Sequence, residues 1–200
     1  TLFRSSAASD VYKRQRQGLP FKPLVRFLGK LMANPSRRAV NELYTFLEHK
    51  SMPITPDGNF VAYKGVTDDF KDFHTGKFDN SVGQTLSMVR NSVCDDANIG
   101  CSYGFHAGSY EYAKGYASNG GHLLRVEIDP TDVVSVPLDC NCQKLRTAKY
   151  KVIALHESIE RPLDDGIYGE YDDDNWDDSD EDTSDAESFG SGWDAGYKQA

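Results

Sequence analysis

Apolar residues recur at helical spacing in the first part of the chain. Between Phe21 and Met32 they follow the i, i+3, i+4, i+7 stripe of an amphipathic helix, at Leu24, Phe27, Leu28 and Leu31. A second helix is expected after Asn34-Pro35, with the asparagine side chain as its cap and the proline at its first position. It is expected to end near His49 and to bury Ala39, Val40, Leu43, Phe46 and Leu47. The short link between the two predicts an antiparallel helix pair.

The pattern changes from Met52 onward to one that is typical of strands. Residues 53–55 and 60–63 flank the turn Pro56-Asp57-Gly58 and predict a hairpin. Ser109 is expected to cap a short helix over residues 110–117. Further strands are predicted over residues 85–89, 122–128, 132–136 and 149–155. Helices followed by strands favour an α+β domain with a mostly antiparallel sheet.

The charge balance divides the chain near residue 162. Residues 163–200 hold fourteen of the 31 acidic residues and one of the 22 basic residues, a net charge of about −13, so the rest carries about +4. Such an acidic tail is expected to be disordered. Its aromatic residues, including Trp176 and Trp193, are also typical of a segment that docks onto a basic or apolar groove. A solubilising and charge-repelling extension is the alternative, and it is favoured. The near-neutral remainder gives no electrostatic basis for nucleic-acid binding.

Residues 5–15 match the in-frame translation of a common transposon sequencing adaptor at all eleven positions. This is a stronger signal than any functional motif in the chain, so residues 1–15 are interpreted as a sequencing artefact and are excluded from the reasoning about the fold. On this interpretation the natural N-terminus is missing. The predicted domain then comprises residues 16–162, followed by the acidic tail of residues 163–200.

No run of roughly 18 apolar residues suggests a membrane span, and no signal peptide is recognisable. Reduced thiols in a cytoplasm are therefore the expected state of the cysteines. Six residues separate Cys94 from Cys101 and one separates Cys140 from Cys142. This spacing is a poor match to the paired ligands of structural zinc. No metal and no cofactor are assigned.

Six segments occur in an order that resembles the rIIB family of T-even-type tailed phages. They are residues 34–47 (NPSRRAVNELYTFL), 53–64 (PITPDGNFVAYK), 78–81 (FDNS), 101–109 (CSYGFHAGS), 129–137 (DPTDVVSVP) and 146–152 (RTAKYKV). The family usually has leucine where Phe105 stands. Its larger members resemble this chain only in their C-terminal part, and they carry an upstream region with a helix-turn-helix-like segment.

The resemblance implies an early phage protein that acts with a larger rIIA-like partner in lysis timing and in protection from prophage-encoded exclusion. It implies a location in the host cytoplasm, with peripheral association with the inner membrane left open. It brings no catalytic residues, and a non-enzymatic role is expected. The candidate binding or family-motif residues are Tyr63, Lys64, Asp79, Asn80, Cys101, His106, Ser109 and Arg146.

Two other functions stay open. The segment Gly104–Ser109 loosely resembles a half-site of ADP-ribosyltransferase-like folds, in which a His or Arg, a hydroxyl and a Glu on three strands surround nicotinamide. Tyr63, His106, Ser109 and Glu127 would supply these types. An enzyme requires Tyr63, His106 and Glu127 to converge within about 8 Å in a cleft, and a degenerate, non-catalytic relative does not. A nucleic-acid-associated phage regulator would depend on the missing upstream region.

Two clusters of charged residues are interpreted as ordinary surface. Asp68, Asp69 and Asp72 lack the ligand spacing of a calcium loop and are expected in solvated loops. A basic cluster near the last strand comprises Lys144, Arg146, Lys149 and Lys151. It either pairs with the acidic tail, meets an acidic partner or forms a solvated strand face, and the last interpretation is favoured.

Overall fold

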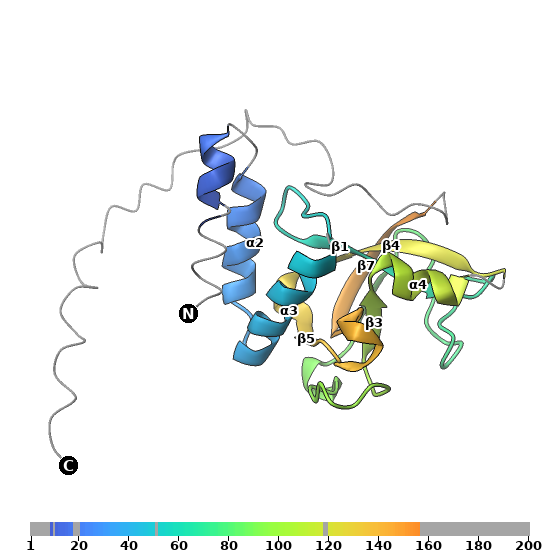
Figure 1. The fold of residues 1–200 in the computed structure, drawn as a ribbon. Coiled ribbons are helices and arrows are strands. Elements are labelled where there is room, and N and C mark those ends of the chain that lie inside the picture. Colours follow the sequence, from blue (N-terminus) through green and yellow to red (C-terminus); the bar gives the residue numbers. More distant parts are fainter. Residues whose placement is uncertain (1–8, 10, 18–20, 51, 118–119, 157–200) are drawn as a thin grey trace, which may run out of the picture. The chain divides into compact units, whose positions relative to one another are not determined.

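The computed structural model describes residues 9, 11–17, 21–50, 52–117 and 120–156. Within these residues the helices α2 (Lys22–Met32) and α3 (Arg37–Lys50) precede an antiparallel sheet that is accompanied by the short helix α4 (Tyr110–Ala117) (Figure 1). The predicted α+β class, with its helix pair and antiparallel sheet, is confirmed. The acidic tail lies outside the described residues.

The described part of the chain forms seven strands in one sheet. They are β1 (Phe60–Val66), β2 (Thr85–Ser87), β3 (Phe105–Gly108), β4 (His122–Ile128), β5 (Val133–Ser135), β6 (Lys144–Thr147) and β7 (Lys149–Leu155), in the spatial order β2-β7-β4-β1-β3-β6-β5. The central strands β1 and β4 pair along their whole length. By contrast, β1 pairs with β3 only through Tyr63 and Gly108. The ladder is therefore interrupted in the middle of the sheet.

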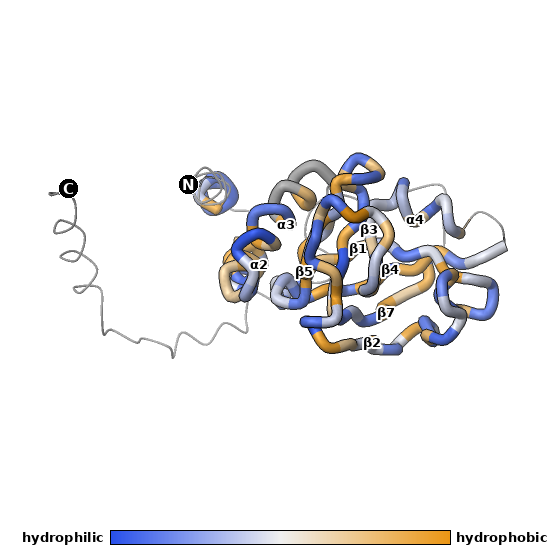
Figure 2. The backbone as a smooth tube through the Cα atoms, turned by 90° about the horizontal axis from the view of Figure 1, so that it is seen from below, coloured by the Kyte–Doolittle hydropathy of each residue, from blue (hydrophilic) through white to orange (hydrophobic). Residues whose placement is uncertain are grey.

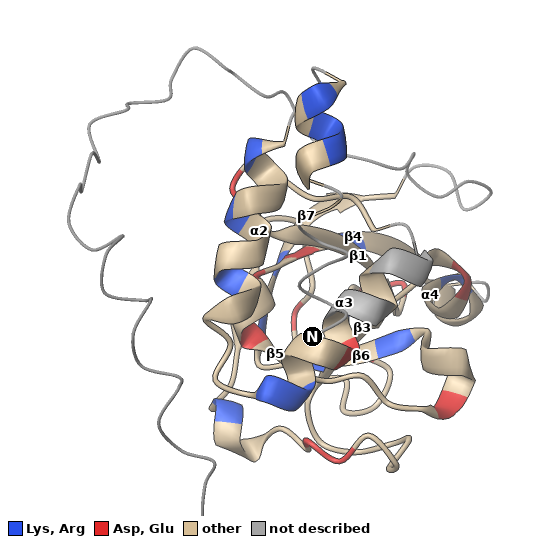
Figure 3. Cartoon of the chain, turned by 60° about the vertical axis from the view of Figure 1, so that its left-hand side comes forward, with Lys and Arg blue, Asp and Glu red and all other residues tan. Residues whose placement is uncertain are grey.

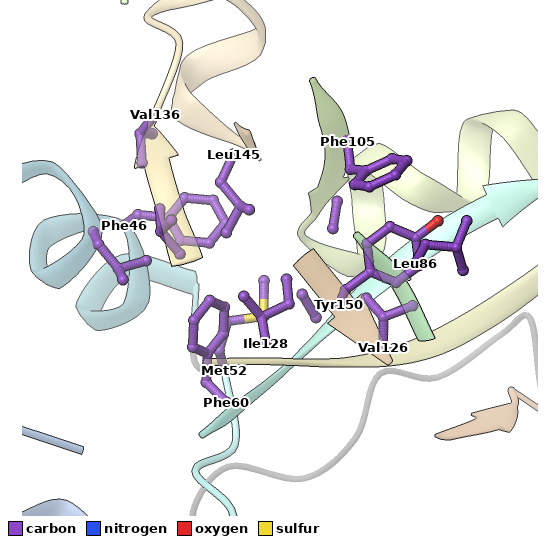
Figure 4. Packing of buried hydrophobic residues seen from close by; sticks show 14 of the residues in the cluster. Phe46, Met52, Phe60, Leu86, Phe105, Val126, Ile128, Val136, Leu145 and Tyr150 are labelled. Atoms are coloured by element: carbon purple, nitrogen blue, oxygen red, sulfur yellow. The ribbon is translucent and has the colours of Figure 1, made fainter. Parts of the chain in front are cut away.

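Side chains alternate along β1, so its two faces contact different helices. Phe60, Ala62 and Val66 belong to the main core together with Phe46 of α3, and apolar stretches occupy the middle of the sheet (Figure 2). Figure 4 shows part of this core, with side chains from α3, the strands and the segment before β1 packed together. The helix pair thus covers one face of the sheet.

The opposite face of β1 carries Tyr63, which packs with Tyr110, Ala113, Ala117 and Leu123 in a smaller buried cluster. Gly65 allows α4 to approach closely. A Cβ atom at this position would lie 2.5 Å from Tyr116 Cβ and 2.7 Å from the Ala113 carbonyl oxygen. Helix α4 is therefore held against β1 by small residues.

The cap of α3 differs from the prediction. Ser36, not Asn34, caps the helix, because Ser36 Oγ accepts a hydrogen bond of 3.2 Å from the Ala39 N–H. The Asn34 side chain accepts from the Ser36 N–H at 2.9 Å. It also donates to the carbonyl oxygens of Pro130 and Val133 at 2.7 and 2.8 Å. Asn34 thus ties the helix pair to the segment that leads into β5.

Strand β6 was not among the strands that the sequence pattern predicted. All four of its residues are buried, including Lys144 and Arg146. The interpretation of the basic cluster as a solvated strand face is therefore wrong for these two residues, while Lys149 and Lys151 on β7 are exposed. The surface basic residues of the helix pair lie along α2 and at the start of α3 (Figure 3).

Candidate functional site

Two adjoining cavities lie where β1 and β3 separate. Their volumes are about 320 Å³ and about 50 Å³. They share four wall residues, Lys64, Asp72, His74 and His106. Of the residues singled out from the sequence, Lys64 and His106 are thus brought together. Cys101 lines the larger cavity and Tyr63 lines the smaller one.

Lys64 extends from β1 across the gap to β3. Its Nζ donates a 2.9 Å hydrogen bond to the His106 carbonyl oxygen and lies 5.5 Å from the centre of the Tyr150 ring. Burial lowers the pKa of Lys64 to about 8, although the nearby Asp72 carboxylate opposes the shift. Lys64 is therefore deprotonated in a larger fraction of molecules at neutral pH than an exposed lysine.

His106 stands on β3 opposite Arg146 of β6. Burial, reinforced by the positive charges of Lys64, Arg146 and Lys144, lowers the pKa of His106 to about 3. The imidazole is therefore neutral at physiological pH. Its Nε2 is buried and has no hydrogen-bond partner within the described residues. The His74 ring lies edge-on to it, with 6.3 Å between the ring centroids.

Asp72 and His74 belong to the site although the sequence reasoning placed Asp72 in a solvated loop and did not select His74. Asp72 orders this loop by accepting hydrogen bonds from the N–H groups of Thr75, Lys77 and Phe78 at 2.7–3.0 Å. Burial tends to raise the pKa of Asp72, but these bonds outweigh it and hold the pKa below its usual range. The role of Asp72 in this turn could have been predicted from the sequence, because an aspartate shortly before Thr75-Gly76 is typical of a turn that is capped by a side chain.

Asp79 and Asn80 stabilise the end of the same loop by hydrogen bonds within residues 78–81. The Asp79 carboxylate accepts from Ser81 N–H at 3.0 Å and from Ser81 Oγ at 2.6 Å, which holds its pKa below the usual range. Asn80 is fully buried and donates to the Phe78 carbonyl oxygen at 2.9 Å. Its Oδ1 accepts a hydrogen bond from the Tyr150 hydroxyl. Both candidates thus shape the cavity wall without lining it.

Ser109 and Arg146 also have structural roles. Ser109 caps α4 as predicted, with Oγ 3.2 Å from the Tyr112 N–H. The Arg146 guanidinium has no exposed surface and donates to the hydroxyl of Ser135 and to the carbonyl oxygens of Cys94, Asp96, Ile99 and Gly100. Arg146 therefore fixes the loop that precedes Cys101, at the rim of the larger cavity.

The candidate triad of an ADP-ribosyltransferase-like enzyme is not assembled around either cavity. Tyr63 and His106 both line the smaller one, but Glu127 lines neither. Glu127 pairs across the ladder with Val61, and its Oε1 accepts a 2.8 Å hydrogen bond from the side chain of Asn59. This carboxylate therefore fastens the hairpin before β1 to β4.

The four cysteines are free thiols; Cys101 and Cys140 are exposed, and Cys94 and Cys142 are half-buried. Hydrogen bonding from Ser102 lowers the pKa of Cys94. In the part of the chain that the structure describes, no group of three or more His, Cys, Asp or Glu side chains is placed to hold a metal ion. Nor is any helix among these residues long and apolar enough to cross a membrane.

Comparison with known proteins identifies the relatives of this chain. The family model described as "Bacteriophage T4 protein rIIB" matches residues 4–164. Protein rIIB of Enterobacteria phage T4 is 37% identical over 150 residues, which is 75% of this chain and 48% of that protein. The chain thus spans about half the length of this curated relative. No solved structure matches. The resemblance inferred from the six ordered segments is confirmed, and the chain belongs to the rIIB family of phage proteins.

Proposed function

We propose that this chain is an interaction domain that acts with a rIIA-like phage protein in lysis timing and in protection from prophage-encoded exclusion. The observation that carries the proposal is the family membership, with 37% identity to protein rIIB of phage T4 over 150 residues. The association with the partner takes place in the host cytoplasm or at the inner face of the inner membrane.

The roles of the family-motif residues support an interaction protein rather than an enzyme. Asn80, Ser109 and Arg146 direct their hydrogen bonds inward, to loops and a helix end of the same domain. Groups that are used in this way maintain the shape of the surface and are not available to a substrate. Glu127 is likewise bound to Asn59. These side chains therefore maintain the fold, which supports a role in binding rather than in catalysis.

A chimaeric phage T4 protein rIIB tests the proposal. Its matching region is replaced by residues 16–162 of this chain, so that the upstream half is retained. A T4 phage that lacks its own rIIB is then plated on a host with an excluding prophage, and the chimaera is expected to restore plaques and to co-purify with the rIIA protein. A version with the matching region deleted is the control. A soluble chimaera that neither restores plaques nor co-purifies would refute the proposal.

An assay with NAD distinguishes the proposed interaction protein from an ADP-ribosyltransferase-like enzyme. Incubation of the chain with labelled NAD and host lysate is expected to give no hydrolysis and no transfer, because Glu127 lies outside the cavities. A labelled product that disappeared in the His106→Ala variant, but persisted in the His122→Ala variant, would support the enzyme instead.

A further inference from the structure

The gap between β1 and β3 is an opening in the interior of the sheet. These strands are neighbours in the middle of the strand order, yet they pair only through Tyr63 and Gly108. Beyond this point Lys64 Nζ makes a 2.9 Å hydrogen bond to the His106 carbonyl oxygen. Because side chains alternate along a strand, Lys64 lies on the face of Ala62 and the main core, while His106 lies on the opposite face from Phe105. The two cavities therefore meet at the opening.

Aromatic rings form much of the wall of the larger cavity, from Phe78, Tyr103, Phe105 and Tyr150. Phe78 and Tyr150 both lie edge-on to Phe105, with ring centroids 5.1 and 5.2 Å apart. The volume of about 320 Å³ is at the lower end of the roughly 300–1,000 Å³ found for ligand pockets. It suits a molecule with one ring and a few substituents, and it is too small for a dinucleotide.

Two polar groups in the wall of the cavity, Lys64 Nζ and His106 Nε2, have hydrogen-bonding capacity that is not fully used within the described residues. Lys64 Nζ has three hydrogen-bond donors, and a single hydrogen bond from it, to the His106 carbonyl oxygen, occurs among the described residues. His106 Nε2 is buried and has no partner in the same part of the chain. The one carboxylate of the wall, Asp72, is already bound to the N–H groups of its own loop. Lys64 Nζ therefore has donors available for a further hydrogen-bond acceptor.

We propose that this cavity binds a small planar molecule with one aromatic ring and a carboxylate, the ring lying against the aromatic wall and the carboxylate accepting a hydrogen bond from Lys64 Nζ. The carboxylate adds a hydrogen-bond acceptor for Lys64 Nζ and a second negative charge beside that of Asp72. The ring replaces water against Phe78 and Phe105, where apolar contact is favourable. This proposal does not rest on the rIIA-like partner, because it is argued from the cavity and from the contacts of Lys64 and His106 alone.

Reductive trapping measures access to Lys64. Salicylaldehyde is added to the full chain with cyanoborohydride at pH 7. The neutral Lys64 amine attacks the aldehyde carbon, water leaves to give an imine, and hydride from cyanoborohydride reduces the imine to a stable secondary amine. Because burial lowers the pKa of Lys64 to about 8, its neutral fraction exceeds that of an ordinary lysine by on the order of 100-fold. Peptide mass spectrometry is expected to find Lys64 labelled at least tenfold faster than Lys71.

Competition by benzoate then tests the ligand class. Millimolar benzoate is expected to slow labelling of Lys64 at least fivefold and to leave Lys71 unchanged. Cyclohexanol, which lacks the carboxylate and the planar ring, is the matched control and is expected to give no protection. In the Cys101→Trp variant, where an exposed wall residue is enlarged to fill the cavity, protection by benzoate is expected to disappear. Labelling of Lys64 no faster than of Lys71, an equal effect of cyclohexanol, or unchanged protection in Cys101→Trp would each overturn the proposal.

Discussion

At the scale of single residues, Arg146 and His106 both have buried side-chain nitrogen atoms but differ in their hydrogen-bond partners. The Arg146 guanidinium donates hydrogen bonds to five oxygen atoms of the chain. His106 Nε2 has no hydrogen-bond partner within the described residues, and burial lowers the pKa of the imidazole to about 3. A neutral imidazole is thus compatible with burial only while the solution pH stays well above that value.

The depressed pKa of His106 makes the fold sensitive to acid. The unfolded chain binds a proton at about pH 6.5, while the folded chain does not until about pH 3. The unfolded state therefore holds more protons in this window, and stability falls as the pH falls. Between pH 7 and pH 4.5 the free energy of unfolding is expected to decrease by roughly 2–3 kcal/mol from this group. In His106→Gln this loss should be absent in urea titrations; equal losses in both proteins would contradict the assignment.

Arg146 offers a second test at this scale. Arg146→Met keeps most of the volume but leaves the carbonyl oxygens of the loop at residues 94–100 without their donor. Each buried acceptor without a partner costs about 1–3 kcal/mol, and some will be reached by water. The expected loss in unfolding free energy is roughly 2–4 kcal/mol. Lys149→Met, an exposed residue of the same basic cluster, should change it by less than about 0.5 kcal/mol. Similar values for both variants would show that the loop does not depend on Arg146.

At the scale of elements, the helix pair is joined to the sheet by both apolar and polar contacts. Leu43 and Phe46 of α3 are in the main core, and neither exposes more than 2% of its surface. Asn34 and Arg90 add hydrogen bonds, because Arg90 donates to Asn34 Oδ1 at 2.9 Å and to the Val133 carbonyl oxygen at 2.8 Å. The position of the pair is therefore fixed by the segment before β5.

The hairpin before β1 is held in the same way. Gly58 adopts a φ of +76° at the turn, and a Cβ atom there would lie 2.5 Å from the Phe27 backbone nitrogen. The turn therefore needs glycine for its backbone conformation and for its contact with α2. Lys30 reinforces this contact with bonds to Asn59 at 2.6 Å and to Asp129 at 3.0 Å.

Leu43→Ala measures how strongly α3 is held. The side chain is fully buried, so its truncation is expected to lower the free energy of unfolding by roughly 2–5 kcal/mol. Leu138→Ala is the control, since Leu138 is 60% exposed and its truncation should cost less than about 0.5 kcal/mol. Chemical denaturation of both variants is the measurement. A change below 0.5 kcal/mol at Leu43 as well would contradict the packing of α3 on the sheet.

At the scale of the whole molecule, one core connects the helix pair with the strands. The main cluster extends along the sequence from Phe27 to Val152 and includes residues of β2, β3 and β7. Every described element that carries core side chains therefore lies inside the domain predicted at residues 16–162. Among the described residues of the adaptor-like segment, 9 and 11–15, none belongs to this cluster.

A fragment of residues 20–162 is expected to fold without these flanks. Its circular dichroism spectrum should show folded helix and strand. Its melting temperature should lie within roughly 3 °C of that of the full chain, which corresponds to a difference in the free energy of unfolding of less than about 1 kcal/mol. A fragment that aggregated or showed the spectrum of an unfolded chain would mean that residues outside the range stabilise the domain.

The sequence by itself determined the elements whose signals are local. Apolar spacing predicted the helix pair, and strong strand patterns predicted β4 and β7 with their observed bounds. Ser109 was correctly expected as a helix cap, because a cap requires only its neighbours along the chain. The ordered motif segments were sufficient for the family, because they depend on the order of residues and not on their positions in space.

Tertiary structure alone decided the features that depend on distant neighbours. Lys144 and Arg146 look like surface residues in the sequence, but the loop at residues 94–100 and Asp139 supply the oxygen atoms that make their burial possible. Asn34 was taken for a cap because its partners in the segment before β5 lie about a hundred positions later. The cavity likewise depends on tertiary structure, because it lies where β1 and β3 separate after a single pair. Lys64 and His106 meet there although their strands are far apart in the chain.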